Sequence, residues 1–187
     1  SAIIIIKKCS KDYERNTLNK FSEVDYIDPD WKKYIKEDWK KHDVKCRVVF
    51  LDRDGTINVD KVNTHKIEDL EYFSNEFEAL KQLVDSGFKL IVVSNQDGIF
   101  HGMYTKKEMH DFNMKMVEDF KKHGIKISAI YYSPHETFEN HFSFKPNPGM
   151  LLRASYEFNI SLKDSFLIGD QLHDVIAAKR MDVKPIL

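Results

Sequence analysis

The sequence contains little cysteine, glycine or proline, and this scarcity narrows the classes of protein it can belong to. Of its 187 residues, two are cysteine, seven are glycine and five are proline. Cys9 and Cys46 are too few for a disulfide framework, and their spacing matches no zinc-binding cluster. The low glycine and proline content excludes collagen-like and low-complexity sequence.

An excess of charge and a long hydrophobic run are also absent. The 29 basic and 30 acidic residues leave a formal net charge of -1, so no general affinity for nucleic acid or for a membrane surface is expected. The longest apolar run, residues 2–6, is too short to cross a bilayer or to act as a secretory signal. With 42% hydrophobic residues, the chain can form the core of one domain. Together with the absences above, this predicts a soluble, single-domain protein of the cytoplasm.

Residues 1–46 differ in character from the rest and are interpreted as an N-terminal extension. The β-prone run at residues 3–6 predicts a strand that pairs with a sheet edge. Apolar side chains at helical spacing predict an amphipathic helix that contains Trp31, Tyr34, Ile35 and Trp39. Such a segment either packs against the main domain or docks a partner protein or a second copy, and both alternatives stay open.

From residue 47 onward, short apolar runs alternate with helical stretches. The runs predict buried strands over residues 48–51, 90–93, 127–132 and 166–168, with one more strand in 183–187. Two helical faces lie between them, made by Phe77, Leu80, Leu83 and Val84 and by Met109, Phe112, Met116 and Phe120. Thr105 and Glu108 match a capping box, and Pro148 suits the first turn of a further helix.

Strands that alternate with helices predict an α/β fold, with a Rossmann-like parallel sheet in a three-layer α/β/α arrangement. The segments between the strands are too short for a large cap domain. In such folds the functional site lies beyond the carboxyl ends of the strands. The residues that follow each strand are therefore the ones to inspect.

The first strand runs directly into Asp52 and Asp54. Two carboxylates this close repel each other, and a divalent cation such as Mg²⁺ would relieve that repulsion. Gly55, which follows, permits a sharp exit from the strand. An ordinary acidic turn is the alternative interpretation of this motif taken alone.

Three further segments supply polar groups at the same edge. Ser94, Asn95, Gln96 and Asp97 follow the second strand, Lys145 precedes the helix that begins near Pro148, and Asp170 and Asp174 follow the fourth strand. The last two acids, four residues apart, are expected to share one face of the following turn. Carboxylates, a hydroxyl and an ammonium group together suit phosphoryl transfer, in which positioning and charge neutralisation provide most of the catalysis.

These motifs carry a resemblance to a known family. The strings FLDRDGTIN (50–58), SNQDGI (94–99), YYSPH (131–135), KPNPGML (145–151) and IGDQLHD (168–174) resemble those of the haloacid dehalogenase-like phosphatases. Within that family they are most similar to the branch of D-glycero-D-manno-heptose 1,7-bisphosphate phosphatases and histidinol phosphatases. The resemblance identifies residues 47–187 as the phosphatase domain.

The resemblance also implies roles for individual residues. Asp52 would be the nucleophile that forms an aspartyl-phosphate, and Asp54 the general acid and base. Ser94, Asn95 and Lys145 would bind the phosphoryl group. Mg²⁺ would be held by Asp52, the backbone carbonyl of Asp54, and Asp170, with support from Asp174. Substrate contacts are expected at Asp60, Asn63, Gln96, Asp97, Phe144 and Gln171.

The sequence departs from the heptose branch at several of these positions. Where the family has the cysteine and histidine ligands of a zinc loop, this chain has Ser133, His135, His141 and Ser143. Without a thiolate, a structural zinc site is not expected. Phe144 and Gln171 stand where the family has an arginine and often a lysine, which argues against a second phosphate near the site.

The prediction is therefore a Mg²⁺-dependent phosphatase of carbohydrate metabolism that acts on a small phosphomonoester, a sugar phosphate or a related metabolite. A phosphatase for nucleic-acid 3′ ends shares some of the motifs, but the near-neutral charge disfavours it. A non-catalytic binding protein on the same fold is the third alternative. The presence of all the catalytic positions argues against that one.

Overall fold

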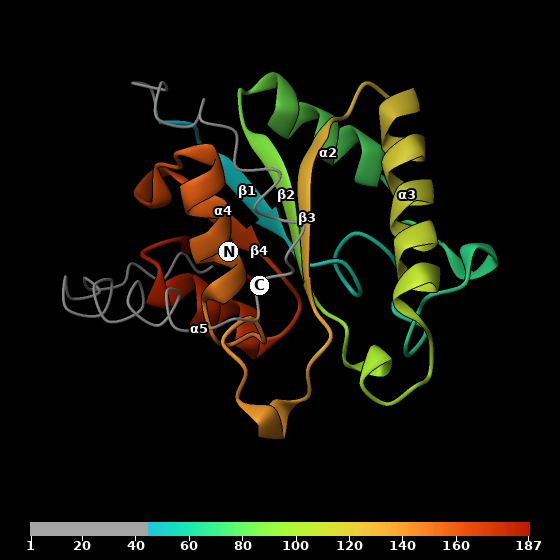
Figure 1. Ribbon diagram of the computed structural model, residues 1–187. Helices are drawn as coiled ribbons and strands as arrows, with labels where there is room; N and C mark the ends of the chain where they lie inside the picture. Colours follow the sequence, from blue (N-terminus) through green and yellow to red (C-terminus); the bar gives the residue numbers. More distant parts are fainter. Residues whose placement is uncertain (1–44) are drawn as a thin grey trace.

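The computed structural model describes residues 45–187 (Figure 1). The strand and helix predicted in the N-terminal extension lie outside the described residues and stay predictions. Within residues 45–187, no helix is both long enough and apolar enough to cross a bilayer.

The described chain forms a five-stranded parallel sheet with the strand order β3-β2-β1-β4-β5. The strands are β1 Val48–Leu51, β2 Lys89–Asn95, β3 Ile127–Ser133, β4 Phe166–Ile168 and β5 Lys184–Ile186. The helices are α2 Glu76–Asp85, α3 Lys106–Lys122, α4 Gly149–Phe158 and α5 Leu172–Arg180, and the short 3-10 turns are η3 Ile67–Asp69, η4 Asp97–Ile99, η5 Thr137–Glu139 and η6 Leu162–Asp164.

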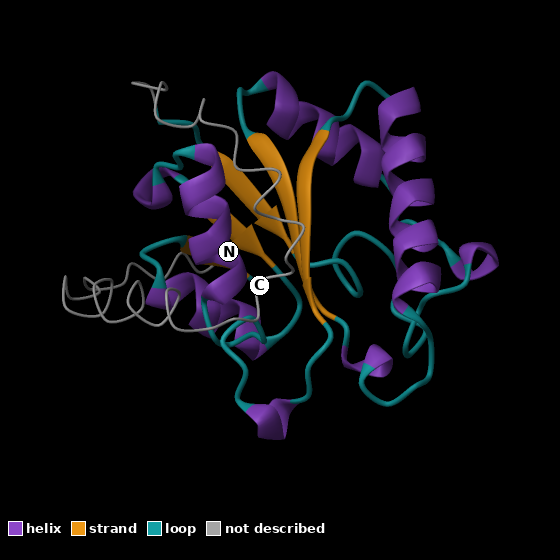
Figure 2. Cartoon of the chain, viewed as in Figure 1, coloured by secondary structure: helices purple, strands orange, loops and turns teal. Residues whose placement is uncertain are grey.

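Alternating side chains of the sheet enter two separate cores. On β1, Val48 and Phe50 pack with residues of α4 and α5, whereas Val49 and Leu51 pack with residues of α2 and α3. This alternation follows from the pleat, which directs successive side chains to opposite faces. Helices on both faces of the sheet form the predicted three-layer α/β/α arrangement (Figure 2).

The predicted strands and the two predicted helical faces are confirmed, as is the further strand near the C-terminus. The capping box at the start of α3 is also confirmed, because the Thr105 hydroxyl accepts from the backbone N–H of Glu108 at 3.2 Å while the Glu108 carboxylate accepts from the backbone N–H of Thr105 at 2.7 Å. Residues 45–187 contain no large cap domain.

Two local predictions need correction. Pro148 is the N-cap of α4 and not part of its first turn. Asp170 and Asp174 do not share a helix face, because α5 begins at Leu172 and Asp170 precedes it. Asp174 folds back instead, and its carboxylate accepts from the backbone N–H of Gln171 at 3.2 Å. This cap satisfies a donor that the first helical turn leaves without an intrahelical partner.

The strand order places a change of direction at the centre of the sheet. From β1 the chain winds outward to β2 and β3, then returns to place β4 on the other side of β1. Ligands bind outside the carboxyl ends of the strands at such a point. The ends of β1, β2 and β4 therefore define where the site is expected.

Candidate active site

Asp52 leaves the carboxyl end of β1 and is almost completely buried. Its backbone N–H donates to the carbonyl of Ile168 at the end of β4 (2.9 Å), which fixes its place between two parallel strands. Its Oδ1 accepts the backbone N–H of Arg53 at 2.7 Å. Burial raises the pKa of Asp52 to about 6, with the Lys145 ammonium opposing the shift and the Asp174 carboxylate adding to it.

Lys145 lies beside Asp52 and is completely buried. Its Nζ lies 3.0 Å from Oδ1 of Asp52 and 2.6 Å from Oδ1 of Asp174, and it donates to the carbonyl of Val93 at 2.9 Å. Burial by itself would lower the pKa of Lys145, but the two carboxylates outweigh it and hold the pKa above its usual value. A charged ammonium group is therefore fixed between two carboxylates from β1 and α5.

Asn95 holds the main chain of Lys145 in place. Its side-chain Oδ1 accepts the backbone N–H of Lys145 at 2.9 Å, and its Nδ2 donates to the carbonyl of Lys145 at 3.0 Å. The amide of Asn95 thus ties the end of β2 to Lys145. This places the predicted phosphate-binding residue next to the ammonium group.

Asp54 follows two residues after Asp52, and its carboxylate is held by three side chains. Arg53 forms an ion pair with it (Nη2 to Oδ2, 2.7 Å), Asn58 donates to Oδ1 at 3.0 Å, and Gln96 donates to Oδ2 at 2.9 Å. The Asp54 side chain is 21% exposed, whereas that of Arg53 is 1% exposed. Buried groups therefore hold Asp54 in place, while part of its side chain stays exposed to solvent.

Ser94, near the end of β2, is buried beside Asp54. Its hydroxyl accepts from Nε2 of Gln96 at 2.8 Å and donates to the carbonyl of Asn95 at 3.3 Å. The structure thus brings Asp52, Asp54, Ser94 and Lys145 from three separate segments into one connected network.

The acids after β4 occupy two different positions. Asp174 is buried and binds Lys145, and its carboxylate lies where a Cβ atom on Gly169 would come within 2.3 Å of its Cγ. Asp170 is exposed, and its carboxylate lies against the turn after β1. A Cβ on Gly55, whose φ is +82°, would approach Oδ2 of Asp170 to 2.3 Å, so only glycine leaves room for this carboxylate.

A divalent cation fits the donors at this end of the sheet. One ligand atom each of Asp52, His173 and Asp174 lie within 4.8 Å of one another. The carboxylate of Asp170, which follows β4, lies against Gly55 in the turn after β1. The formal charges of the Lys145 ammonium and of the carboxylates of Asp52, Asp170 and Asp174 sum to about -2. A hard cation, which prefers oxygen ligands, would neutralise this charge.

The other predicted substrate-contacting residues lie on the loops around this network. Asn63 contacts Gly98, where a Cβ would come within 2.8 Å of Oδ1 of Asn63, so two of these loops meet there. Asp60 accepts the backbone N–H of Val62 at 2.8 Å, and Gln171 donates to Asp170 at 3.0 Å. Asp97 and Gln171 are accessible at the rim, whereas Phe144 is buried. Gln96 is also buried, and its side-chain amide forms hydrogen bonds with the side chains of Asp54, Ser94 and Tyr104.

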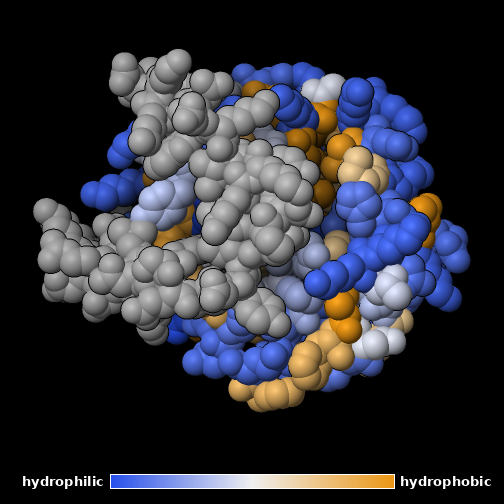
Figure 3. Space-filling view, viewed as in Figure 1, coloured by the Kyte–Doolittle hydropathy of each residue, from blue (hydrophilic) through white to orange (hydrophobic). Residues whose placement is uncertain are grey.

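Two loops at the rim are joined to each other. Nε2 of His101 lies 2.5 Å from Oε2 of Glu136, and the rings of Phe100 and Phe138 meet edge to face at 5.5 Å. Both phenylalanines are exposed, and hydrophobic residues gather at the lower edge of the view where Figure 1 places η5 (Figure 3). Two side-chain contacts therefore link the loop after β2 to the loop after β3.

The residues that replace the zinc ligands of the heptose branch still lie together. The hydroxyl oxygens of Ser133 and Ser143 are 2.8 Å apart, and Nδ1 of His141 lies 2.8 Å from the Ser143 hydroxyl. The rings of His135 and His141 are stacked at 3.5 Å. Burial lowers the pKa of His141, with a further contribution from His135. The expectation that no structural zinc binds here stays a prediction.

Sequence reasoning did not single out Arg53, His173 or Tyr104. Arg53 could have been found, because a charged residue between two aspartates at the end of a buried strand needs a buried partner. His173 precedes Asp174 and lies within reach of Asp52; burial lowers its pKa, followed by the effect of Lys145. Tyr104, which donates to Oε1 of Gln96 at 2.8 Å, has no sequence signal, because the loop brings it back to that position.

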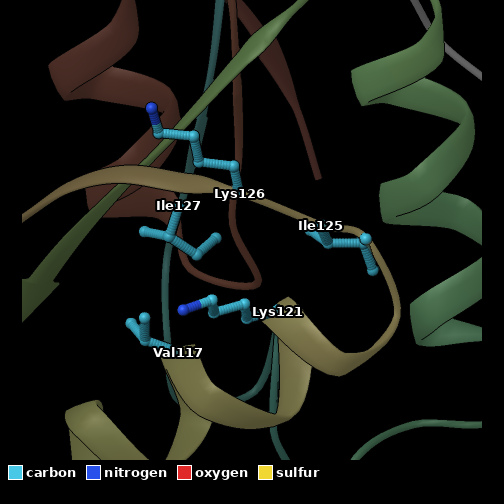
Figure 4. A pocket seen from close by; sticks show the side chains of 6 residues that line it. Val117, Lys121, Ile125, Lys126 and Ile127 are labelled. Atoms are coloured by element: carbon cyan, nitrogen blue, oxygen red, sulfur yellow. The ribbon is translucent and has the colours of Figure 1, made fainter.

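A surface hollow lies away from this polar network. It has a volume of about 320 Å³ and lies between the end of α3 and the start of β3, where Val117, Lys121, Ile125 and Ile127 line it (Figure 4). This is the amino end of β3, opposite the edge at which the polar network gathers. The hollow is therefore not part of the candidate active site.

The fold and the site define the class of this protein, and comparison with known families agrees. The chain belongs to the haloacid dehalogenase-like hydrolases, because the model of that family matches residues 2–187. The resemblance predicted from the five sequence motifs is confirmed.

Its relatives identify the kind of hydrolase. An enzyme of Campylobacter jejuni named D-glycero-alpha-D-manno-heptose-1,7-bisphosphate 7-phosphatase is 38% identical over 144 residues, which are 77% of this chain and 83% of that enzyme. D-glycero-beta-D-manno-heptose-1,7-bisphosphate 7-phosphatase of Helicobacter pylori is 39% identical over 139 residues, which are 74% of this chain and 80% of that enzyme. The protein is therefore a phosphatase, a hydrolase of phosphoric monoesters.

A solved structure supports the fold. The crystal structure of D,D-heptose 1,7-bisphosphate phosphatase from B. bronchiseptica, complexed with magnesium and phosphate, aligns with a TM-score of 0.70 at 24% sequence identity. The alignment covers 74% of this chain and 78% of that chain. The predicted Rossmann-like α/β fold is confirmed.

Proposed function

We propose that this protein is a Mg²⁺-dependent phosphatase that releases phosphate from a sugar phosphate through an aspartyl-phosphate on Asp52. The observation that carries the proposal is the position of Asp52. It lies at the carboxyl end of the central strand, its Oδ1 is 3.0 Å from the buried Lys145 ammonium, and it shares a network with Asp54 and Ser94. Such pre-organised charge is what phosphoryl transfer requires.

The reaction divides into two displacements at phosphorus. The backbone N–H of Arg53 and the ammonium of Lys145 both bind Oδ1 of Asp52, which orients Oδ2 for attack. As the bond from Oδ2 to phosphorus forms, the bond from phosphorus to the sugar oxygen breaks, and Asp54 donates a proton to that oxygen. Asp54 then takes a proton from water, the water oxygen bonds to phosphorus, and the bond to Asp52 breaks to release phosphate.

Ser94 and Lys145 would hold the transferring group. The Ser94 hydroxyl donates a hydrogen bond to a phosphoryl oxygen, and the Lys145 ammonium offsets the negative charge on the phosphoryl group. Because Lys145 is buried and already fixed by three oxygen atoms, it needs no rearrangement during the reaction.

Mg²⁺ would be held by Asp52, Asp170 and the backbone carbonyl of Asp54, with Asp174 supporting these residues from behind. When bound, the ion would neutralise charge on the phosphoryl oxygens. The close approach of Asp170 to Gly55 supports this donor set, since it brings a carboxylate from β4 to the turn that contains Asp52.

We propose a phosphorylated heptose as the substrate, because the relatives that cover most of this chain are named for one. Asp60, Asn63, Asp97 and Gln171, the rim residues predicted to contact substrate, offer carboxylates and amides, which suit sugar hydroxyls. None of these four is cationic, so a second phosphate is not expected to bind there. This function would place the enzyme in carbohydrate metabolism in the cytoplasm.

The test compares the wild-type protein with Asp52→Asn on a small panel of substrates. The panel contains D-glycero-D-manno-heptose 1,7-bisphosphate, the corresponding 7-phosphate and a 3′-phosphorylated oligonucleotide, and phosphate release is measured with Mg²⁺ and with a chelator. We expect turnover of a heptose phosphate that requires Mg²⁺ and falls roughly a thousandfold or more in Asp52→Asn.

Asp85→Asn, which alters an exposed carboxylate of α2, is the matched control and should retain wild-type activity. Preferred cleavage of the oligonucleotide would replace the sugar phosphate with a nucleic-acid 3′ end. A folded wild-type protein without activity on any of the three would favour the binding protein. Substantial activity in Asp52→Asn would refute the nucleophile assignment.

A further inference from the structure

Gln96 lies within the polar network and contacts both Asp54 and Ser94. Its side chain is buried, with the residue only 2% exposed. One amide nitrogen, Nε2, lies 2.9 Å from Oδ2 of Asp54 and 2.8 Å from the hydroxyl of Ser94. The same atom therefore bridges the proposed acid and base and the proposed phosphoryl-binding hydroxyl.

The chemistry of the neighbours determines the orientation of the amide. Oδ2 of Asp54 accepts from Nη2 of Arg53 at 2.7 Å, so this oxygen is an acceptor and the nitrogen of Gln96, not its oxygen, must face it. On the other side, Oε1 accepts the hydroxyl of Tyr104 at 2.8 Å. Both amide hydrogens and the amide oxygen are thus engaged by side chains, and the amide cannot rotate without losing three hydrogen bonds.

Tyr104 fixes the far end of this bridge. Its ring is 5% exposed and stacks on the ring of His65 at 4.7 Å. A Cβ on Gly98 would come within 2.2 Å of the Tyr104 ring, so glycine is required for this close packing. Burial raises the pKa of Tyr104 to about 12, and its hydroxyl therefore stays a donor to Gln96.

We infer that Gln96 is a positioning residue. It holds the carboxylate of Asp54 and the hydroxyl of Ser94 in the relative positions that phosphoryl transfer requires. This inference rests on the proposed function, and it differs from the sequence-based prediction that Gln96 contacts the substrate. Because Gln96 donates to the Ser94 oxygen, that hydroxyl acts as a donor in turn. It donates to the carbonyl of Asn95 across a long 3.3 Å contact, which it would exchange for a phosphoryl oxygen of the substrate. Because Gln96 also donates to Oδ2 of Asp54, it holds that carboxylate against rotation.

The inference predicts a particular pattern of kinetic loss in Gln96→Leu, which keeps the volume and removes the amide. A misplaced Asp54 impairs protonation of a sugar oxygen, whereas p-nitrophenolate leaves without a proton. In the first turnover, with enzyme in excess, release of the sugar should slow by about tenfold to a hundredfold. Release of p-nitrophenol from p-nitrophenyl phosphate should slow less, and the concentration of sugar phosphate that gives half the maximal rate should change little.

Tyr104→Phe provides a second variant that removes one hydroxyl and keeps the ring packing. We expect a smaller slowing with the same preference for the sugar phosphate. Gln82→Leu, an exposed glutamine of α2, is the matched control and should behave as the wild type. Circular dichroism and thermal melting check that each variant folds.

The outcomes separate this inference from the function on which it rests. If the wild type is inactive, or if Asp52→Asn is active, the proposed function fails. If the wild type is active, Asp52→Asn is inactive and Tyr104→Phe slows both first-turnover reactions equally or not at all, the positioning role of Gln96 fails and the function stands. Equal slowing of both substrates in a folded Gln96→Leu variant would also overturn the inference.

Discussion

At the scale of single residues, the ammonium of Lys145 balances the negative charges of Asp52 and Asp174. A buried ammonium without partners would lose its proton, but Asp52 and Asp174 each place an oxygen within hydrogen-bond distance of it. Removing one member of such a buried group is costly because the remaining charges lose their compensation. Asp170 stands apart from this group, since it is exposed and its carboxylate accepts from Nε2 of Gln171 at 3.0 Å. It can therefore be altered without breaking the buried network.

Asp170→Ala is expected to weaken Mg²⁺ binding and to leave folding intact. Loss of one carboxylate ligand should raise the Mg²⁺ concentration for half-maximal activity by about tenfold or more. The measurement is a Mg²⁺ titration of phosphate release from the best substrate of the panel. Asp85→Ala controls for the loss of one exposed carboxylate. An unchanged Mg²⁺ titration in Asp170→Ala would remove that residue from the ligand set.

At the scale of elements, the strands present the chemistry and the helices hold their ends in place. β1 leads to Asp52, β2 contains Ser94, and β4 leads to Asp170, while the first turn of α5 places Asp174 beside Lys145. Helix α2 takes no part in the site, but it begins with a half-buried acid, Glu76. Burial raises the pKa of Glu76 from 4.5 to about 7.

This shift predicts how stability changes with pH. Between about pH 4.5 and about pH 7 the folded protein holds a proton on Glu76 that the unfolded chain has lost, so this group makes the free energy of unfolding decrease as the pH rises. Glu76→Gln removes the effect. The variant should gain stability relative to the wild type as pH rises, by about 1 kcal/mol at about pH 8, since the helix N-terminus partly stabilises the charged form.

Urea unfolding of both proteins at about pH 5 and about pH 8 checks the prediction, because the pH dependence of all other groups cancels in the difference. Glu78→Gln, in the same helical turn, controls for the loss of one charge. A stability difference that shrinks as the pH rises would contradict the assigned sign.

At the scale of the whole molecule, two hydrophobic cores hold the sheet between its helical layers. The core against α4 and α5 contains Leu167, a completely buried residue of β4. β4 lies between β1 and β5 and has only three residues, so its position depends largely on the packing of this side chain. The same strand leads into Asp170, which links the core to the site.

Leu167→Ala should therefore lower the free energy of unfolding by about 2–5 kcal/mol, because it removes buried apolar surface and leaves a cavity. Leu172→Ala, at a position that is 68% exposed, should change it by about 0.5 kcal/mol or less. Denaturant unfolding measures both. Equal effects of the two substitutions would show that β4 is not anchored by the core.

The sequence determined the fold class and the general position of the site. Apolar runs alternating with helical faces predicted β1 to β4 and the helices α2 and α3, since each pattern arises from local backbone geometry. Parallel strands share one carboxyl edge, so polar residues after each run had to gather there. The position of Asp52, Ser94, Lys145 and Asp170 near that edge followed from the chain order alone.

Only the tertiary structure decided which of these groups touch. The 3.0 Å contact between Lys145 and Asp52 spans 93 positions of the chain, and the bridge from Gln96 to Asp54 spans 42. Such distances depend on sheet register, loop path and packing, which local patterns do not contain. Burial is likewise a property of the folded chain, and no local pattern predicted that a buried Gln96 would link Asp54 to Ser94.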